Sequence, residues 1–197
     1  MDFVEGAIGS PWVYLALCAF AALDAFFPIV PSESLVITAG VFAASGEPNL
    51  AGVIVVSALG AFVGDHVSYF IGRFAGEKAM KRAKPGSRKA AAWARGHRLL
   101  TERGGTILIV CRYIPGARTA ITLTAGAVEY RLRSFSFFDA IAALSWGAYS
   151  ALVGYIGGAA FEQSPWKGLA LGLGIALTVT LTVELIRHLR RPRTAAP

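Results

Sequence analysis

The sequence predicts an all-α integral membrane protein, built as an inverted repeat of a re-entrant helical hairpin followed by a transmembrane helix. Three observations predict this class. First, 55% of the 197 residues are hydrophobic and 16% are charged, with a mean hydropathy of +0.55, whereas about a quarter of a soluble domain is charged. Second, the apolar residues form long blocks, and prolines and charged side chains interrupt two of them. Third, part of the first interrupted block recurs in the second.

Residues 26–44 form the first interrupted block, which contains Pro28, Pro31 and Glu33. Proline ends a continuing helix because it has no amide hydrogen to donate, and an unpaired carboxylate at membrane depth costs several kcal/mol. The apolar part that follows Glu33 is only about half as long as a membrane-spanning helix. We therefore expect a re-entrant hairpin over residues 24–46.

The second interrupted block, residues 106–130, carries arginines where the first carries its acid. Pro115 and Gly116 break the chain there, and Arg112 and Arg118 lie on either side of the break. We expect this block to form a second re-entrant hairpin. Charged groups at membrane depth need a partner or water, so we also expect the two breaks to face each other.

Three further segments are long and apolar enough to cross a bilayer: 50–72, 135–160 and 166–187. The apolar segment 11–25 is shorter than the roughly 20 residues that a spanning helix needs. We expect an N-terminal helix here, interfacial or steeply embedded, with Pro11 at its first position and Ser10 as its N-cap. Whether this helix crosses the bilayer is left open by its length.

These elements form two units within a single membrane domain. The first unit covers residues 10–72 and the second covers residues 106–160. A basic segment, 73–105, joins the units, and its part from 87 to 103 is expected to lie on the membrane surface as a short helix. A basic tail, 188–197, follows the C-terminal transmembrane helix.

Positive charge is concentrated in particular segments. No Lys or Arg precedes Arg73, whereas ten lie from Arg73 to Arg103 and four more arginines lie near the end of the chain. A net charge of +7 suggests nucleic acid in a soluble protein, but these basic residues flank apolar spans as the positive-inside rule requires. We therefore expect no nucleic-acid partner. The basic segment, the turn at 131–133 and the C-terminus are then cytoplasmic, so the first hairpin opens outward and the second toward the cytoplasm.

Several residues of the first unit recur in the second at one constant offset. They are Leu35, Thr38, Ala39, Gly40, Tyr69 and Gly72 in the first unit, and Ile121, Thr124, Ala125, Gly126, Tyr155 and Gly158 in the second. Each unit contains an odd number of crossings, so successive copies must be inverted in the bilayer. Inverted repeats with broken helices that meet near the midplane are an architecture of transporters.

The charged residues at the two breaks are the candidate site. Arg112 and Arg118 remain charged at physiological pH and can hold a phosphate or carboxylate through parallel hydrogen bonds, to which free amides at the break would add. Glu33 can accept a proton, and a carboxylate that alternates between a proton and an arginine partner acts as a coupling device. Asp24 is either a second proton site or a residue at the hairpin entry. The alternative is that Glu33 and the arginines pair only to hold the hairpins together.

Other polar residues in the apolar blocks are weaker candidates. Asp65 belongs either to a proton path, with His66, or to a buried hydrogen bond near Tyr69. Asp139 lies near the predicted cytoplasmic boundary, where we expect it to be solvated, and Trp146 is interpreted as a core or interface residue. Close helix packing is predicted at four glycines: Gly60, Gly64, Gly72 and Gly76. The histidines and cysteines have no ligand spacing, so no metal site or cofactor is expected.

Some of these residues combine into a recognisable pattern: the stretch Phe-Pro-Ile-Val-Pro-Ser that precedes Glu33, the segments 64–76 and 112–118, and Trp146. The pattern resembles the DedA family, the bacterial branch of the SNARE-associated or VTT-domain superfamily, over about residues 10–165. The resemblance implies a multi-pass protein of the bacterial cytoplasmic membrane that recycles undecaprenyl phosphate, scrambles phospholipids or maintains the proton-motive force.

The resemblance also implies residue roles. Glu33, Arg112 and Arg118 match the acid and the two arginines on which activity in the family depends. The family often has a second acid in the turn after the first hairpin. Around that place this chain has Ser45 rather than an acid, and Glu47 follows two residues later. Glu47 is therefore an inexact match to the second acid.

We therefore expect a proton-coupled lipid-phosphate translocase whose partners are a membrane lipid and protons, with self-association left open. The alternatives are a phospholipid scramblase, a proton-coupled transporter of small ions or solutes and, from another class, a lipid-phosphate phosphatase. A phosphatase needs a histidine nucleophile or a metal cluster near its arginines. No histidine lies within a dozen residues of Arg112 or Arg118 in the sequence.

Overall fold

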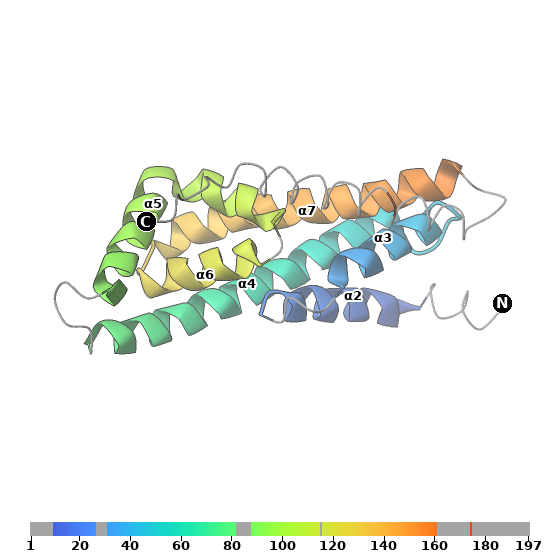
Figure 1. The fold of residues 1–197 in the computed structure, drawn as a ribbon. Helices are drawn as coiled ribbons and strands as arrows, with labels where there is room; N and C mark the ends of the chain where they lie inside the picture. Colours follow the sequence, from blue (N-terminus) through green and yellow to red (C-terminus); the bar gives the residue numbers. More distant parts are fainter. Residues whose placement is uncertain (1–9, 27–30, 82–87, 115, 161–173, 175–197) are drawn as a thin grey trace, which may run out of the picture.

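The computed structural model describes residues 10–26, 31–81, 88–114, 116–160 and 174. Within these ranges the chain forms six α-helices and no β-strand, which confirms the predicted all-α class. The helices are α2 (Pro11–Asp24), α3 (Ser32–Ala43), α4 (Leu50–Lys81), α5 (Arg88–Arg112), α6 (Ala117–Ala127) and α7 (Leu132–Ala160), shown in Figure 1.

Two long helices, α4 and α7, pack on each other and run along the bundle in opposite directions (Figure 1). Their segments Leu50–Gly76 and Leu132–Ala160 are long and apolar enough to cross a membrane. They agree with the first two predicted spans. The third predicted span, 166–187, and the basic tail, 188–197, lie outside the described residues except for Gly174.

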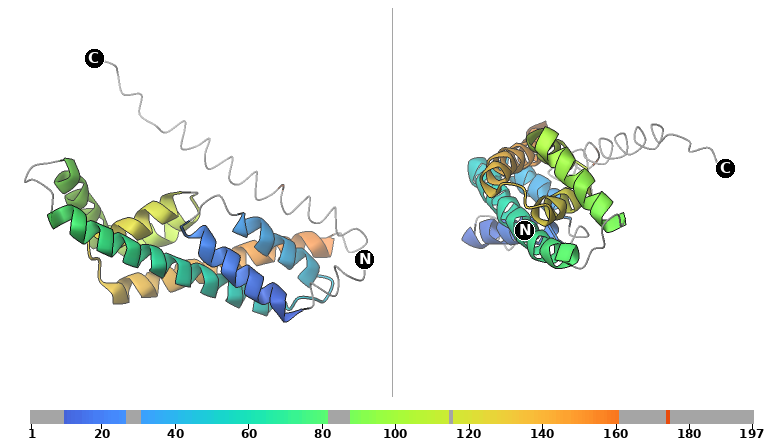
Figure 2. Two further views of the ribbon diagram at one scale, coloured as in Figure 1. Left: turned by 90° about the horizontal axis from the view of Figure 1, so that it is seen from below. Right: turned by 90° about the vertical axis from the view of Figure 1, so that its left-hand side faces the viewer.

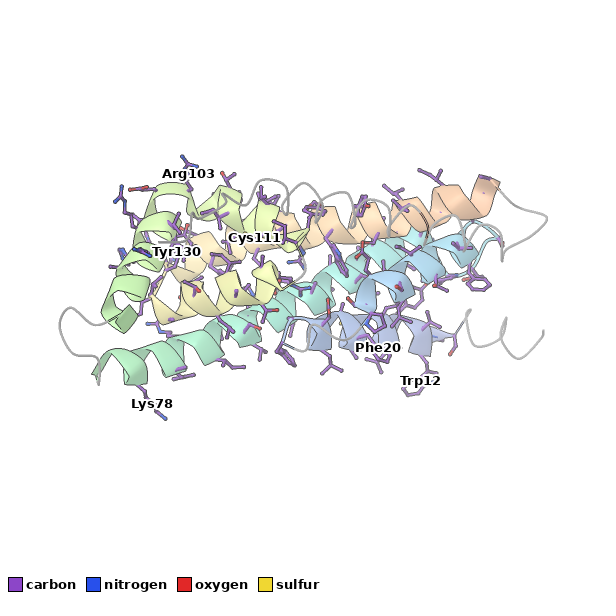
Figure 3. All side chains as sticks on the ribbon, viewed as in Figure 1. Trp12, Phe20, Lys78, Arg103, Cys111 and Tyr130 are labelled. Carbon is purple, nitrogen blue, oxygen red and sulfur yellow. The ribbon has the colours of Figure 1, made fainter. Side chains whose placement is uncertain are left out.

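The outer surface of the bundle is strongly apolar. Trp12 is 74% exposed and projects from α2 away from the other helices (Figure 3). Along α4, large apolar side chains are exposed once per helical turn at Val55, Leu59, Val63 and Val67. An exposed apolar surface of this extent suits contact with lipid tails rather than water.

The short helices form two pairs, and each pair covers one half of the long helices. Figures 1 and 2 place α2 and α3 along one half and α6, with the last turns of α5, along the other. The facing ends of α2 and α3 are close, since the Ser32 hydroxyl donates to the Asp24 carboxylate at 2.8 Å. The ends of both pairs that face the middle of the bundle also meet, because the Thr119 hydroxyl donates to the Ala25 carbonyl oxygen at 2.9 Å.

The first pair differs from the expected hairpin over residues 24–46. That segment contains a single helix, α3, and the partner of α3 is α2, which lies before it in the sequence. Ser10 caps α2 by accepting from the Trp12 amide at 3.4 Å, with Pro11 at the first position, as predicted. A helix of 14 residues is about 21 Å long, well short of the roughly 30 Å bilayer core.

The second pair contains two helical arms within residues 106–130, the segment for which a second re-entrant hairpin is expected. Its first arm is the end of α5, which bends at Arg103, where φ is −137° and ψ is 16°. The part of α5 before this bend corresponds to the predicted surface helix at 87–103, and Figure 3 labels Arg103 at the corner.

Glycines allow the short helices to pack against the long ones in a reciprocal way. A side chain at Gly40 of α3 would meet the backbone of α7 at Ala151 and Tyr155, and one at Gly126 of α6 would meet the backbone of α4 at Tyr69. These pairs correspond in the sequence repeat: the short helix of each unit packs on the long helix of the other. The glycine spacing on α4 also has its predicted role: a Cβ at Gly60 or Gly64 would meet the backbone of α2, and one at Gly72 or Gly76 would meet the backbone of α6.

Candidate functional site

Five charged residues from five helices meet where the two pairs of short helices face each other. Asp24 ends α2, Arg112 ends α5, and Arg118 lies in the first turn of α6. Asp65 and Asp139 come from the two long helices, α4 and α7. The helix breaks therefore bring arginines to the middle of the bundle, as predicted, while three aspartates surround them.

Asp65 is shared by both arginines. Its Oδ2 accepts from Arg112 Nη1 at 2.6 Å, and its Oδ1 accepts from Arg118 Nε at 2.8 Å. The Asp65 side chain is 0% exposed. A buried carboxylate is costly unless its oxygens are paired, and here each oxygen has its own guanidinium. The site is thus organised around a residue that the sequence marked as a minor candidate.

Each arginine also has an aspartate partner of its own. Arg112 Nη1 lies 3.3 Å from Asp139 Oδ1, and Arg118 Nη1 lies 3.3 Å from Asp24 Oδ2. The five residues therefore form an ion chain in which charges alternate in the order Asp24, Arg118, Asp65, Arg112 and Asp139. With all members ionised, two guanidiniums and three carboxylates leave the ion chain with one net negative charge.

Three guanidinium nitrogens in this ion chain are buried without a hydrogen-bond partner in the described part of the structure. They are Nε and Nη2 of Arg112 and Nη2 of Arg118. A buried donor without an acceptor costs about 1–3 kcal/mol, and more when it is charged. Trp146 stacks near Arg112, with the guanidinium carbon 5.6 Å from its ring centroid, but a ring face does not replace hydrogen bonds. These buried donors therefore have hydrogen-bonding capacity that the described residues do not use.

The backbone at the second break favours the same chemistry. Gly116 precedes α6 with φ +73°, a conformation that a residue with a side chain rarely adopts. It turns the chain so that α6 starts next to Arg118, and no side chain caps this helix start. The positive end of a helix attracts anions. Pro115, the other predicted break residue here, and Pro28 in the first break lie outside the described residues, whereas Pro31 directly precedes α3.

Glu33 lies in the first turn of α3, half-buried, and makes no ion pair or hydrogen bond through its side chain with any described residue. The structure does not pair it with Arg112 or Arg118, and its charged neighbour is Asp24. The carboxylate that we expected to alternate between a proton and an arginine is Glu33. Of the two acids expected to couple protons, Asp24 contacts an arginine directly in the structure and Glu33 does not.

Asp139 corrects the sequence prediction most clearly. We expected it to be solvated at the membrane boundary, but only 3% of its side chain is exposed and it contacts Arg112. The prediction was wrong because distance from the end of a span does not reveal which face of a helix is covered by another segment. The end of α5 covers Asp139, and only the fold shows this.

Two weaker candidates lie outside the ion chain. The Tyr69 hydroxyl donates to the Tyr130 carbonyl oxygen and not to Asp65, so it ties α4 to the turn before α7. Glu47 is exposed in the turn between α3 and α4. In the described residues no group of three His, Cys, Asp or Glu side chains is placed to hold a metal ion.

Comparison with known proteins gives one family. The VTT domain model matches residues 30–156. Protein DedA of Escherichia coli is 29% identical over 191 residues, which cover 94% of this chain and 87% of that protein. An uncharacterized membrane protein of Mycobacterium tuberculosis is 30% identical over 184 residues, or 92% of this chain and 81% of the relative.

A protein of Lactococcus lactis named alkaline phosphatase-like is 24% identical over 139 residues, which cover 68% of this chain and 65% of that protein. No solved structure matches the chain. The resemblance seen in the sequence motifs is thus confirmed, and the matched domain contains the whole ion chain except Asp24. The chain is a helical membrane protein that belongs to the DedA, or VTT-domain, family.

Proposed function

We propose that this protein is a lipid-phosphate translocase that moves undecaprenyl phosphate across the bacterial cytoplasmic membrane with the help of protons. The observation that carries the proposal is the set of three unpartnered guanidinium nitrogens on Arg112 and Arg118, all of them hydrogen-bond donors. Phosphate oxygens are strong acceptors with the geometry that arginine prefers. The phosphate would bind between the two arginines while the polyprenyl chain stays in the lipid.

Protons enter the proposal through charge balance. The ion chain has one more carboxylate than it has guanidiniums, so an added phosphate would leave a buried site with strong excess negative charge, which is unfavourable at low dielectric. A proton taken up by a carboxylate offsets part of this charge and frees an arginine. The pairing of Asp24 with Arg118 at 3.3 Å supports this role for Asp24, and Glu33, which interacts electrostatically with Asp24, would pass the proton on.

We further propose that the two units form an inverted repeat with re-entrant hairpins. The reciprocal packing of α3 on α7 and α6 on α4 supports this arrangement. Short paired helices with their breaks in the middle of the bundle are the form that such a repeat would take. By the positive-inside rule the basic segment at 73–105 and the C-terminus would lie in the cytoplasm.

A translocation assay tests the function. Purified protein is reconstituted into liposomes that contain a fluorescent polyprenyl phosphate, and the loss of the outward-facing probe to a membrane-impermeant quencher or phosphatase is followed. We expect Arg112→Ala and Arg118→Ala to abolish the protein-dependent rate, while Arg98→Ala, on the exposed face of α5, leaves it unchanged. Wild-type rates in both arginine variants would refute the proposal. Competition by glycerophospholipids in the same liposomes separates a scramblase from a selective translocase.

Two observations favour the phosphatase alternative: the position of His66 in the fold and the name of one relative. His66, distant from the arginines in sequence, lies 3.5 Å from Asp139, the partner of Arg112. The Lactococcus lactis relative is named alkaline phosphatase-like. However, both ring nitrogens of His66 already have partners, Phe62 and Ser136, so neither is placed as a free nucleophile. Inorganic phosphate released from the lipid would favour the phosphatase.

A further inference from the structure

The ion chain continues beyond Asp139 to a histidine. His66 Nδ1 lies 3.5 Å from Asp139 Oδ2, and that oxygen accepts no hydrogen bond from any described residue by the usual criteria. His66 stands next to Asp65 on α4, but its ring turns toward α7, where it packs against Phe135 with ring centroids 5.1 Å apart. The extended ion chain therefore has a titratable group beyond each arginine: Asp24 next to Arg118, and the pair of Asp139 and His66 next to Arg112.

The hydrogen bonds of His66 prepare it to take up a proton. Nδ1 faces two acceptors, the Phe62 carbonyl oxygen at 2.8 Å and the Asp139 carboxylate, so Nδ1 carries the hydrogen in the neutral ring. Nε2 lies 2.8 Å from the Ser136 hydroxyl oxygen, which donates to the neutral ring. When Nε2 gains a proton, the hydroxyl turns and accepts instead. Protonation thus costs no hydrogen bond.

The charges around this pair come from every neighbouring helix. Asp65 on α4 and Arg112 on α5 contact or face Asp139 directly, and Arg118 on α6 and Asp24 on α2 lie further along the ion chain. Glu33 on α3 is beside Asp24 and makes no contact with His66. Two guanidiniums therefore face three aspartates and one neutral imidazole. A positive charge on His66 would bring the six-residue cluster to neutrality.

We propose that His66 and Asp139 form a second proton-binding site, whose protonation draws Asp139 away from Arg112 and leaves that guanidinium to the anionic headgroup. Asp139 lies between the two cations, with Oδ2 3.5 Å from His66 Nδ1 and Oδ1 3.3 Å from Arg112 Nη1, so a positive charge on His66 attracts the carboxylate and weakens its hold on Arg112. Binding of a phosphate and binding of a proton at His66 then favour each other by linkage. This inference rests on the proposed function, since it assigns a proton to the same anion site.

The exposure of the side chains supports two separate proton entries. Asp65 and Arg112 at the centre are 0% and 2% exposed, whereas His66 is 18% and Asp24 is 20% exposed. A proton cannot pass along the ion chain itself, because arginine does not give up its proton. Each end therefore exchanges protons with its own surroundings and releases its own arginine.

The first arm of the test needs no lipid. Imidazole resonances of the full chain in nanodiscs are followed by NMR between about pH 5 and 8, the range in which histidines titrate. The sequence has only three histidines, so His66→Gln identifies the signal. We expect the His66 signal to titrate and its midpoint to move to lower pH in Asp139→Asn, which lacks the carboxylate that stabilises the imidazolium. A His66 signal that does not titrate in this range, or a midpoint that Asp139→Asn leaves in place, overturns the proposal.

The second arm measures protons taken up when polyprenyl phosphate binds, by calorimetry near pH 6.5 in buffers of different ionisation enthalpy. The lipid phosphate titrates in the same range, so wild type is compared with His66→Gln on the same lipid, and with His97→Gln, an exposed histidine on α5. We expect proton uptake per bound lipid to be larger in wild type and in His97→Gln than in His66→Gln, by roughly half a proton or more. Equal uptake in all three proteins overturns the proposal. If wild type binds no lipid phosphate at any pH, the proposed function fails, and the His66 titration still decides whether the proton site exists.

Discussion

At the scale of single residues, three aspartates hold the two arginines. The acids near the site differ in how many ion pairs a substitution would remove. Asp65 is completely buried and pairs with both guanidiniums. Glu33, in contrast, has no ion pair in the described structure. We therefore expect stability and the proposed transport to depend on different acids, which substitutions can separate.

Asp65→Asn should strongly destabilise the protein. Removing one partner of a buried ion pair leaves an uncompensated charge and costs about 3–5 kcal/mol, and here two guanidiniums lose a shared carboxylate. The free energy of unfolding in detergent micelles measures the loss. Glu47→Gln, in an exposed turn, serves as the control and should change it by less than about 0.5 kcal/mol. A similarly small effect of Asp65→Asn would show that this carboxylate does not hold the arginines.

Glu33→Gln should leave stability within about 0.5 kcal/mol of wild type, because the substitution breaks no ion pair with a described residue. We expect translocation driven by a pH gradient to fall roughly tenfold, the size of a typical coupling between two binding events. Rates with and without the gradient in the same liposomes measure it. A Glu33→Gln protein that still responds fully to the gradient would remove Glu33 from the proton path.

At the scale of helices, contact between short and long helices depends on glycines that have no room for a side chain. A Cβ at Gly126 would meet the Tyr69 carbonyl oxygen and would lie 2.7 Å from the Arg73 amide nitrogen. Backbone atoms cannot rotate away as side chains do, so α6 itself must shift. Since α6 carries Arg118, this packing also positions the site.

Gly126→Ala should therefore destabilise the protein by about 1–3 kcal/mol, the usual cost of overpacking, and should weaken translocation. Gly174→Ala is the matched control, because nothing lies within 4 Å of a Cβ at that position. Thermal unfolding of both variants in detergent provides the comparison. Equal stabilities would mean that α6 does not pack on α4 as closely as described.

The same scale shows why sequence predicted some elements and missed others. The prolines, Gly116 and the arginines marked both breaks because each residue conflicts locally with a spanning helix. The pairing of α2 with α3 was missed, since an apolar helix of 14 residues fits an interfacial position as well as a packed one. Asp139 and His66 were misjudged or given little weight because their partners lie on other helices, at separations that no local pattern encodes.

At the scale of the whole molecule, the turn before α4 and the turn before α7 lie at opposite ends of the bundle (Figure 1). The turn before α4 contains Glu47 and the turn before α7 leads to Arg133, and the two long helices run in opposite directions (Figure 1). If the bundle spans the membrane as proposed, these turns face opposite compartments. By the positive-inside rule, the basic residues near Arg133 would then place its side in the cytoplasm.

Labelling of single cysteines tests this orientation. In a background with Cys18 and Cys111 replaced by alanine, Glu47→Cys should react with a membrane-impermeant maleimide added to intact cells, and Arg133→Cys should react only after the cells are opened. Both positions are exposed, so access depends on the compartment and not on burial. Labelling of both cysteines from the same side would contradict the spanning arrangement.

The central claim is that Arg112 and Arg118 together bind a lipid phosphate headgroup, and equilibrium binding tests it most directly. Native mass spectrometry of the purified protein compares polyprenyl phosphate with the uncharged polyprenol for wild type, Arg118→Lys and Arg98→Lys. Lysine keeps the charge but cannot supply guanidinium N–H groups to Asp65, Asp24 and a ligand at once. We predict that wild type and Arg98→Lys prefer the phosphate by at least tenfold, or about 1.4 kcal/mol, and that Arg118→Lys loses most of this preference. Equal binding of phosphate and alcohol by wild type, or an undiminished preference in Arg118→Lys, would contradict the claim.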